Sequence, residues 1–325
     1  MRPAMIAVVI PCHRVRKHVL AVLAAIGPEV GRVYVVDDAC PERTADLVEA
    51  ECHDPRVRVL RNERNLGVGG ATLAGLRMAL ADGAEVVVKL DGDGQMDPAL
   101  IPRLVQPILA GEADYAKGNR FFELEGLAAM PRSRLLGNAL LSFASKLSSG
   151  YWNVFDPTNG FTAIHGAVAR QLPLAKLATG WFFESDLLFR LGTLRAVVCD
   201  VPMPAVYEDE SSNLRAGRVI PTFLRGHFVN TAKRIFYSYF LRNFNFASIE
   251  LVAGKALVLF GLGFGLWQWA EGSLRGVPAT SGTVMLAALP VLLGTQLLLA
   301  FLSYDLQNVP RDPLQRRLVP LPPRP

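Results

Sequence analysis

Residues 86–98 read Val-Val-Val-Lys-Leu-Asp-Gly-Asp-Gly-Gln-Met-Asp-Pro, an apolar run that leads directly into an acidic, glycine-rich turn. The run is typical of a buried strand, and the carboxylates of Asp91 and Asp93, two residues apart at its end, point in the same direction. Carboxylate and amide oxygens suit a hard divalent cation, so Asp91, Asp93 and Gln95 are expected to hold Mg²⁺ or Mn²⁺. Such an ion, open on one side, suits a diphosphate leaving group. A lone Asp-x-Asp is more often an acidic surface turn, so the rest of the chain has to decide.

The surrounding sequence, residues 1–120, alternates short apolar strands with helical segments. Strands are expected at 6–10, 33–36, 57–60 and 85–90, and helices at 17–27, 44–52, 69–81 and 98–109. This order predicts an α/β fold with a mostly parallel, doubly wound sheet. Ligands of such sheets bind beyond the carboxyl ends of the strands, where Asp37, Asp38 and the Asp91–Asp93 turn lie. Further helices are expected at 134–149 and 182–192.

Two long apolar segments, at about 251–270 and 283–304, follow the α/β part. Each has about the 20 residues that cross a bilayer, and buried core helices are the alternative. The loop between them carries only Arg275 as a basic residue, whereas both outer flanks are basic. The positive-inside rule therefore predicts a multi-pass protein of the inner membrane with its body in the cytoplasm. The basic and aromatic residues of 221–250 predict interfacial helices, or an ordinary amphipathic helix.

These patterns divide the chain into a body at 1–220, interfacial helices at 221–250, a transmembrane hairpin at 251–310 and a cytoplasmic tail at 311–325, of which 319–325 is expected to be disordered. The formal net charge is +5, and the arginines form no nucleic-acid-like stripe, so a membrane surface or a phosphate substrate is expected and a nucleic acid is not. The four cysteines contain no Cys-x-x-Cys pair, which argues against structural zinc and for a reducing compartment. The sequence leaves a homo-oligomer open.

Three further segments accompany the 86–98 stretch. They are Val-Val-Ile-Pro-Cys-His at 8–13, Val-Val-Asp-Asp-Ala-Cys-Pro-Glu-Arg-Thr at 35–44 and Arg-Asn-Leu-Gly-Val-Gly-Gly-Ala at 64–71. A carboxylate after the second strand can accept hydrogen bonds from a nucleobase or a ribose, and Asp38 is the first choice, with Asp37 as a helix cap. Gly67 and Gly69 allow close approach of a ligand and open a helix N-terminus, or form a plain turn. Asn65 is expected to fix that loop.

These four segments, in this order, resemble the family 2 inverting glycosyltransferases of GT-A (Rossmann-like) fold, and among them the polyprenyl-phosphate glycosyltransferases of the dolichol-phosphate mannose synthase group. The resemblance covers residues 6–200. It implies a nucleotide-diphosphate sugar donor, a polyprenyl phosphate acceptor at the cytoplasmic membrane face, and Mg²⁺ or Mn²⁺ at Asp91, Asp93 and Gln95. The donor contacts that it implies are Pro11, Asp37, Asp38, Asn65, Gly67, Gly69 and Asp91.

The same resemblance suggests the acceptor side of the site. Gly118-Asn119-Arg120 is similar to a Gly-Ser-Arg motif, and Arg120, Arg132 and Arg134 would hold the acceptor phosphate, because arginine binds phosphate bidentately. Solvated surface arginines are the alternative. Asp156 begins a turn that resembles one near the family's acceptor. Glu-Ser-Asp at 184–186 resembles the Glu/Asp pair that supplies a general base in many relatives, with Asp186 as the candidate base, and a charge pair at a helix start is the alternative. The expected catalytic set is thus Asp93, Asp186, Arg120 and Arg134.

Two departures from the family pattern limit these expectations. His13, Arg14 and Val15 stand where the family usually has Tyr-Asn-Glu, so the nucleobase is not determined. The family's late arginine motif is unmatched, and Arg215 is the candidate for its place. Two alternatives remain open: transfer to a hydroxyl of a cell-envelope glycan or glycolipid, with Asp186 as base, and a non-catalytic membrane scaffold with a glycosyltransferase-like body.

Overall fold

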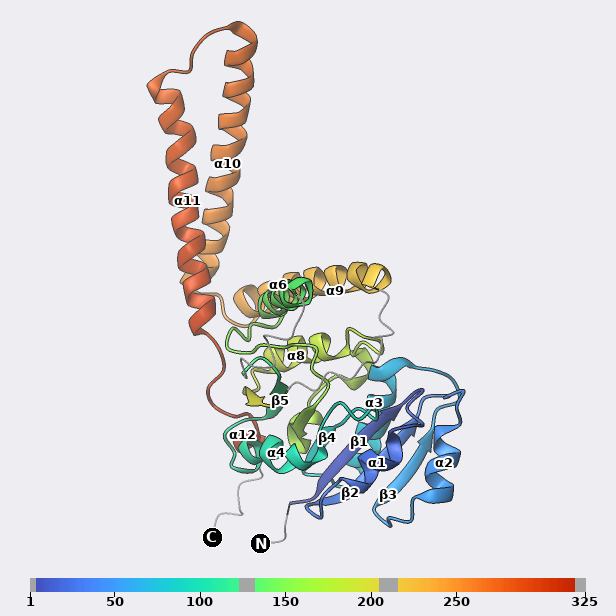
Figure 1. Ribbon diagram of the computed structural model, residues 1–325. Helices are drawn as coiled ribbons and strands as arrows, with labels where there is room; N and C mark the ends of the chain where they lie inside the picture. Colours follow the sequence, from blue (N-terminus) through green and yellow to red (C-terminus); the bar gives the residue numbers. More distant parts are fainter. Residues whose placement is uncertain (1–3, 123–131, 205–215, 319–325) are drawn as a thin grey trace, which may run out of the picture. The chain divides into compact units, whose positions relative to one another are not determined.

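The computed structural model describes residues 4–122, 132–204 and 216–318, and the chain divides into two compact units (Figure 1). Residues 1–231 and 310–325 form the α/β unit, and residues 232–309 form the helical unit. The expected body therefore corresponds to a unit that also takes in the last part of the chain.

The α/β unit is built on a seven-stranded sheet of order β3-β2-β1-β4-β6-β5-β7. All neighbours are parallel except β6, which runs antiparallel to β4 and to β5. The mostly parallel α/β fold expected from the sequence is confirmed. The strands are β1 (Ile6–Cys12), β2 (Val30–Asp37), β3 (Val57–Arg61), β4 (Val86–Lys89), β5 (Tyr115–Asn119), β6 (Thr162–His165) and β7 (Val198–Pro202).

Helices connect these strands at close to the expected positions. They are α1 (Val19–Ala24), α2 (Thr44–Glu51), α3 (Gly67–Ala81), the 3₁₀ turn η1 (Pro98–Leu100), α4 (Ile101–Leu109), α6 (Arg132–Ser149), α7 (Gly166–Ala169), the 3₁₀ turn η2 (Leu174–Lys176), α8 (Phe183–Leu194) and α12 (Gln315–Leu318). The start of η1, after the acidic turn, shows the local cause. The Asp97 side chain accepts a hydrogen bond from the Ala99 N–H, and Pro98 occupies the first helical position. α9 (Ala216–Phe236) crosses from the α/β unit into the helical unit.

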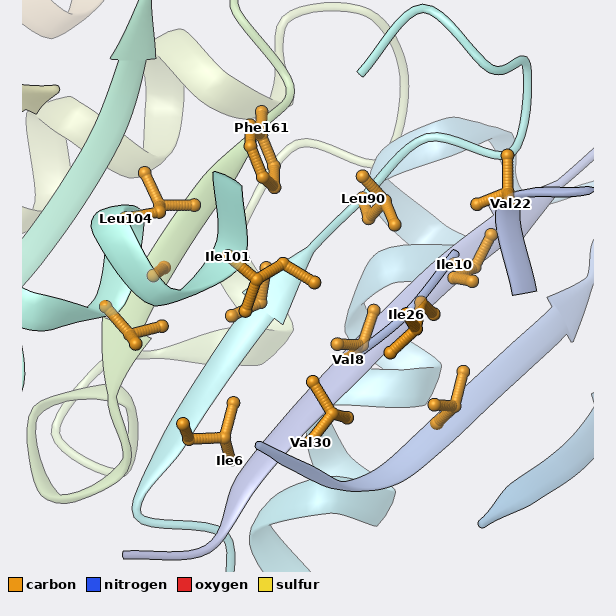
Figure 2. Close-up of a cluster of buried hydrophobic side chains, with 14 of the residues drawn as sticks. Ile6, Val8, Ile10, Val22, Ile26, Val30, Leu90, Ile101, Leu104 and Phe161 are labelled. Carbon is orange, nitrogen blue, oxygen red and sulfur yellow. The ribbon is translucent and has the colours of Figure 1, made fainter. Parts of the chain in front are cut away.

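The core lies on both faces of β1, because successive side chains of a strand point to opposite faces. Figure 2 shows Ile6, Val8 and Ile10 on the face covered by side chains of α1 and α4, including Val22 and Ile101. On the other face α3 approaches closely: a Cβ at Gly75 would lie 2.4 Å from Cγ1 of Val9. Each fully buried aliphatic side chain of this kind contributes about 1.5–3 kcal/mol.

The segment that follows the helical unit returns to the α/β unit. Asp114, just before β5, accepts hydrogen bonds of 2.7 Å from the backbone N–H groups of Leu314 and Gln315. The Gln315 side-chain amide donates to the carbonyls of Ile108 and Ala113. The chain thus leaves the α/β unit and comes back to it. The expected disorder of 319–325 falls outside the described residues.

The helical unit consists of a π-helical turn (Tyr237–Leu241) and the long helices α10 (Phe246–Arg275) and α11 (Ser281–Gln307). The most apolar 18-residue stretch of α10 has a mean hydropathy of 1.8 and that of α11 a mean of 2.2, and both helices are long and apolar enough to cross a membrane. They pack through small residues: a Cβ at Gly294 would lie 2.7 Å from the carbonyl oxygen of Gly254. In the same unit Arg234, one of the basic residues of 221–250, makes a bidentate ion pair with buried Asp305.

Candidate functional site

A local hydrogen bond fixes the conformation of the acidic turn after β4. Oδ1 of Asp93 accepts a 3.0 Å hydrogen bond from the Gln95 N–H, and Gly94 between them has a φ of +81°. Glycine adopts such a conformation without strain. Asp91, Asp93 and Gln95 are all partly exposed. The structure therefore brings the three predicted metal ligands to one solvent-accessible turn at the carboxyl end of a strand.

The donor set of this turn fits a hard cation held in part by other ligands. Asp91 and Asp93 offer carboxylate oxygens and Gln95 an amide oxygen, so the remaining positions would fall to diphosphate and water. Within residues 4–122, 132–204 and 216–318 no group of three or more histidine, cysteine or acidic side chains is arranged to hold a metal ion. When bound, the cation would offset negative charge on a leaving diphosphate.

A buried lysine lies directly beside the turn. Nζ of Lys89 is 2.7 Å from Oδ1 of Asp91 and 3.2 Å from Oε1 of Glu184, at the start of α8. Burial alone would lower the pKa of Lys89, but the two carboxylates outweigh it and raise this pKa above the ordinary value. The sequence gave Lys89 no role, and within the Glu-Ser-Asp segment it favoured Asp186 over Glu184. The signal was the single charged residue in the apolar run Val-Val-Val-Lys-Leu, because a buried charge needs a partner.

Asp186, the expected general base, is engaged elsewhere. Its Oδ2 accepts hydrogen bonds of 3.0 Å from the Ala178 N–H and from Nε of Arg190, and its Oδ1 accepts one from Nδ2 of Asn230. The side chain is buried. Residues two apart on a helix do not face the same side, so Glu184 reaches the metal turn and Asp186 does not. Asp186 therefore fixes a loop and α9, and a role for Asp186 as general base stays a prediction.

The two carboxylates after β2 both bond to the chain itself. Asp37 accepts hydrogen bonds from the N–H groups of Cys40 and Ala45 and so holds the start of α2, as the capping alternative predicts. Asp38 accepts from Nδ2 of Asn62 and from the N–H groups of Leu66 and Gly67, each at 2.8 Å. Asp38 therefore fixes the loop that precedes α3. A contact of Asp38 with the nucleotide stays a prediction.

The glycines that open α3 make close contacts with another loop of the protein. Gly67 has a φ of +80°, and its N–H donates to Oδ1 of Asn65, which fixes the loop as expected. A Cβ at Gly67 or Gly69 would lie 2.7 Å from a carbonyl oxygen of Thr179 or Ala178, respectively. These glycines thus permit packing against the segment before α8. Their approach to a ligand stays a prediction.

A shallow depression lies at the carboxyl ends of β2 and β3. Its volume is about 250 Å³, and Asp37, Cys40 and Asn62 contribute to its lining. The neighbouring His13 lies 3.2 Å from Nδ2 of Asn65 through its Nδ1. Pro11 is buried in β1 opposite Val36 of β2. The residues expected to contact the donor nucleotide thus lie at three places: the carboxyl ends of β1 and β2 (Pro11, Asp37, Asp38), the start of α3 (Asn65, Gly67, Gly69) and the turn after β4 (Asp91).

After β5, Arg120 and Asp156, both expected on the acceptor side, form one bidentate ion pair. Nε and Nη2 of Arg120 donate to the two carboxylate oxygens of Asp156, both at 2.8 Å. Burial alone would raise the pKa of Asp156, but the guanidinium outweighs it and lowers this pKa. Asp156 therefore serves to orient Arg120. Arg132 and Arg134 stand in the first turn of α6, but their side chains, like Arg215, lie outside the described part of the structure.

A buried polar network that the sequence reasoning also missed supports this pair. Nζ of Lys117 donates to the carbonyl oxygens of Phe155 and Gly118 and to Asp200 on β7. Asp200 also accepts a 2.7 Å hydrogen bond from Nδ2 of Asn119. Burial lowers the pKa of Lys117. The network fixes the end of β5, the strand that presents Arg120.

Comparison with known proteins gives consistent matches. Residues 7–172 match the model of "Glycosyl transferase family 2". Undecaprenyl-phosphate mannosyltransferase of Micrococcus luteus is 30% identical over 58% of this chain and 77% of its own length. Polyprenol monophosphomannose synthase of Mycolicibacterium smegmatis is 30% identical over 60% of this chain and 75% of its own. A UDP-N-acetylglucosamine–dolichyl-phosphate N-acetylglucosaminyltransferase of Methanococcus voltae is 27% identical over 65% and 89%.

Solved structures show the same fold. Glucosyl-3-phosphoglycerate synthase from Mycobacterium tuberculosis in complex with UDP superposes with a TM-score of 0.52 at 22% identity, over 71% of this chain and 80% of its own. Its complex with Mn²⁺, UDP-glucose and phosphoglyceric acid gives 0.53 at 21% identity, over 71% and 79%. With the sheet, the acidic turn and the family match together, the chain belongs to glycosyl transferase family 2: it is a GT-A glycosyltransferase of the polyprenyl-phosphate group that its motifs resemble.

Proposed function

We propose that this glycosyltransferase moves a sugar from a nucleotide-diphosphate sugar to a polyprenyl phosphate, with inversion and with Mg²⁺ or Mn²⁺, at the cytoplasmic face of the membrane. The observation that carries the proposal is that one family 2 domain holds both an accessible Asp91–Asp93 turn after β4 and an arginine, Arg120, that Asp156 anchors after β5. The relatives named for undecaprenyl-, polyprenol- and dolichyl-phosphate transfer support the choice of acceptor. The neighbours that hold Mn²⁺ with UDP-glucose support the cation.

The proposed reaction needs little proton transfer. A phosphate oxygen of the acceptor attacks the anomeric carbon from the side opposite the diphosphate, and the bond from that carbon to the diphosphate breaks with its electron pair leaving on the diphosphate. Because the acceptor is already an anion, no strong base is required. Asp186, with both oxygens engaged by the chain, supports this reaction over transfer to a hydroxyl, which would require a base.

Exposed apolar side chains on two helices of the α/β unit support action at a membrane. On α6 and α9 they recur at spacings of three or four, which places them on one face of each helix. Each is more than half exposed: Leu136, Leu140, Phe143, Ile220, Leu224 and Phe228. Ser148 and His227 hydrogen bond across the two helices at 2.8 Å. The exposed apolar faces of α6 and α9, together with the apolar helices α10 and α11, fit an acceptor that is carried by a lipid.

The test is transfer to a defined lipid. Full-length protein is mixed with Mn²⁺, undecaprenyl phosphate and a panel of radiolabelled sugar nucleotides, and the lipid phase is separated by thin-layer chromatography. At least one sugar nucleotide should give a lipid-linked product. Undecaprenol without the phosphate is the matched control and should give none. The proposed acceptor would be contradicted if undecaprenol were labelled as efficiently as undecaprenyl phosphate. It would also be contradicted if the protein bound sugar nucleotides but formed no lipid product.

A further inference from the structure

Lys89 occupies an unusual position for a lysine, at the end of the central strand β4. The residue is only 4% exposed, and its ammonium lies 2.7 Å from Asp91, 3.2 Å from Glu184 and 3.4 Å from the Gly160 carbonyl oxygen. These partners come from the metal turn, from α8 and from the turn before β6. An ammonium has three donors, so this one is directed to three separate parts of the site.

The backbone at Gly160 closes the site around the Lys89–Asp91 pair. A Cβ at this glycine would lie 2.4 Å from Oδ2 of Asp91 and 2.5 Å from Nζ of Lys89. No other residue fits there without displacing one of the two charged groups. Asp91 is therefore held from two sides, by the ammonium at Oδ1 and by the turn of 156–161 near Oδ2.

Lys89 reduces the negative charge around the turn. Asp91, Asp93 and Glu184 carry three negative charges and Lys89 one positive charge, which leaves two net negative charges. The ammonium also lies directly against one of the expected cation ligands. A like charge at this distance opposes the binding of a cation, whereas the diphosphate of the donor adds further anionic ligands.

We propose that Lys89 is a positioning residue for Asp91, which it orients and partly neutralises, so that a divalent cation binds weakly to the protein alone and strongly only together with a diphosphate. Glu184 holds the ammonium between the two carboxylates and limits its pull on Asp91. The inference rests on the proposed function, because it takes Asp91 as a ligand of the catalytic cation.

The experiment measures Mn²⁺ binding rather than turnover. Mn²⁺ is titrated into full-length protein, and free Mn²⁺ is followed by electron paramagnetic resonance, first without nucleotide and then with UDP or with GDP. Lys89→Met should bind Mn²⁺ without nucleotide about tenfold more tightly than the unmodified protein, and UDP or GDP should enhance its binding less. Glu184→Gln, which leaves the ammonium to Asp91 alone, should bind Mn²⁺ at least threefold more weakly. Exposed Lys176→Met is the matched control and should not change it.

The opposite directions separate this role from a merely structural one, because a damaged fold would weaken binding in both variants. Mn²⁺ binding by folded Lys89→Met that is no tighter than normal overturns the inference. If Lys89→Met does not fold, normal Mn²⁺ binding by Glu184→Gln overturns the inference instead. The inference is also overturned if the unmodified protein binds no Mn²⁺ with either UDP or GDP. If Mn²⁺ binding changes as expected but no lipid product forms, only the proposed acceptor is contradicted. If lipid product forms but the variants bind Mn²⁺ normally, only the proposed role of Lys89 is contradicted.

Discussion

Single residues of the acidic turn differ in their surroundings and hence in the effect of replacing them. Asp91 is paired with a buried lysine, whereas Asp93 bonds to the backbone of its own turn. Asp93→Asn keeps the shape of the turn and removes one charge from the cation site. We expect turnover with Mn²⁺ to fall by a factor on the order of 10² or more, the scale for losing a main electrostatic stabiliser. Steady-state rates with and without EDTA check this, and full activity of the variant or of the EDTA-treated protein would contradict it.

Arg120 belongs to the same scale, because its partner Asp156 is buried and fixes its direction. Arg120→Ala, and likewise Arg134→Ala, should raise the KM for polyprenyl phosphate about tenfold or more and leave sugar-nucleotide affinity unchanged, since a bidentate phosphate contact is lost. Acceptor titrations and nucleotide calorimetry measure the two effects. Weakened nucleotide binding with a normal KM for the lipid would place these arginines on the donor side.

Replacement of Asp186 distinguishes a structural role of this residue from a role as general base. Because its carboxylate pairs with Arg190 and accepts from Asn230, Asp186→Asn should destabilise the fold by about 3 kcal/mol, the cost of leaving one charge of a buried pair without its partner. Turnover at a temperature where the variant is folded should change less than about fivefold. Urea unfolding and steady-state kinetics check the two parts. A stable variant without activity would restore Asp186 as the base.

At the scale of elements, α9 packs on α6 and α8 through His227. This histidine hydrogen bonds Ser148 and packs edge-on against Phe182, and burial lowers its pKa to about 4. The unfolded chain, with an ordinary histidine pKa of about 6.5, binds the proton first as pH falls. Stability should therefore decrease between about pH 6.5 and pH 4, by on the order of 3 kcal/mol. His227→Phe should lack this component, and unfolding at pH 7.5, 5.5 and 4.5 measures the difference between the two proteins.

The returning segment at α12 is a second element with a defined test. Gln315→Ala removes two hydrogen bonds to the Ile108 and Ala113 carbonyls, so it should destabilise the α/β unit by about 1–3 kcal/mol. Arg317→Ala, which breaks only an exposed ion pair with Asp312, is the matched control and should have little effect. Denaturant unfolding and proteolysis at the C-terminal end check this. Equal stability of the two variants would show that the segment contributes little.

At the scale of the whole molecule, both ends of the helical unit continue into the α/β unit. If α10 and α11 span the membrane, this connection requires the loop between them to lie on the opposite side from the α/β unit, in agreement with the basic flanks. A membrane-impermeant thiol reagent should therefore label Ala279→Cys in intact cells. Gln307→Cys, at the other end of α11, should react only after lysis. The reverse pattern would contradict the proposed topology.

The same connection changes the design of a soluble body. Removal of all residues after about 250 would leave all seven strands of the sheet in the protein. The structure shows that this cut also removes Leu314 and Gln315, whose backbone N–H groups donate hydrogen bonds to Asp114. A stable body is therefore expected to need residues 310–318 as well.

The sequence alone was sufficient for the features that depend on neighbouring residues. Apolar runs and turn residues predicted β1 to β4, the helices between them and the two long helices α10 and α11, because periodicity along the chain reports which side of an element is buried. The Asp91–Asp93 turn was predicted for the same reason. Antiparallel β6 was not, since a four-residue strand carries little periodicity and its direction depends on its neighbours.

Only the tertiary structure decided which of the chemically suited residues meet. Lys89 and Glu184 are 95 positions apart, and Arg120 and Asp156 are 36 apart, so no local pattern links them. Their contacts follow from the order of the strands, which brings β4, β5 and the start of α8 to one edge of the sheet. The sequence did not show that Glu184, and not Asp186, contacts Lys89, and it gave no sign of the return of Gln315 to Asp114. Periodicity identifies a buried face, but the partner on the other side of that face is set by the path of the chain.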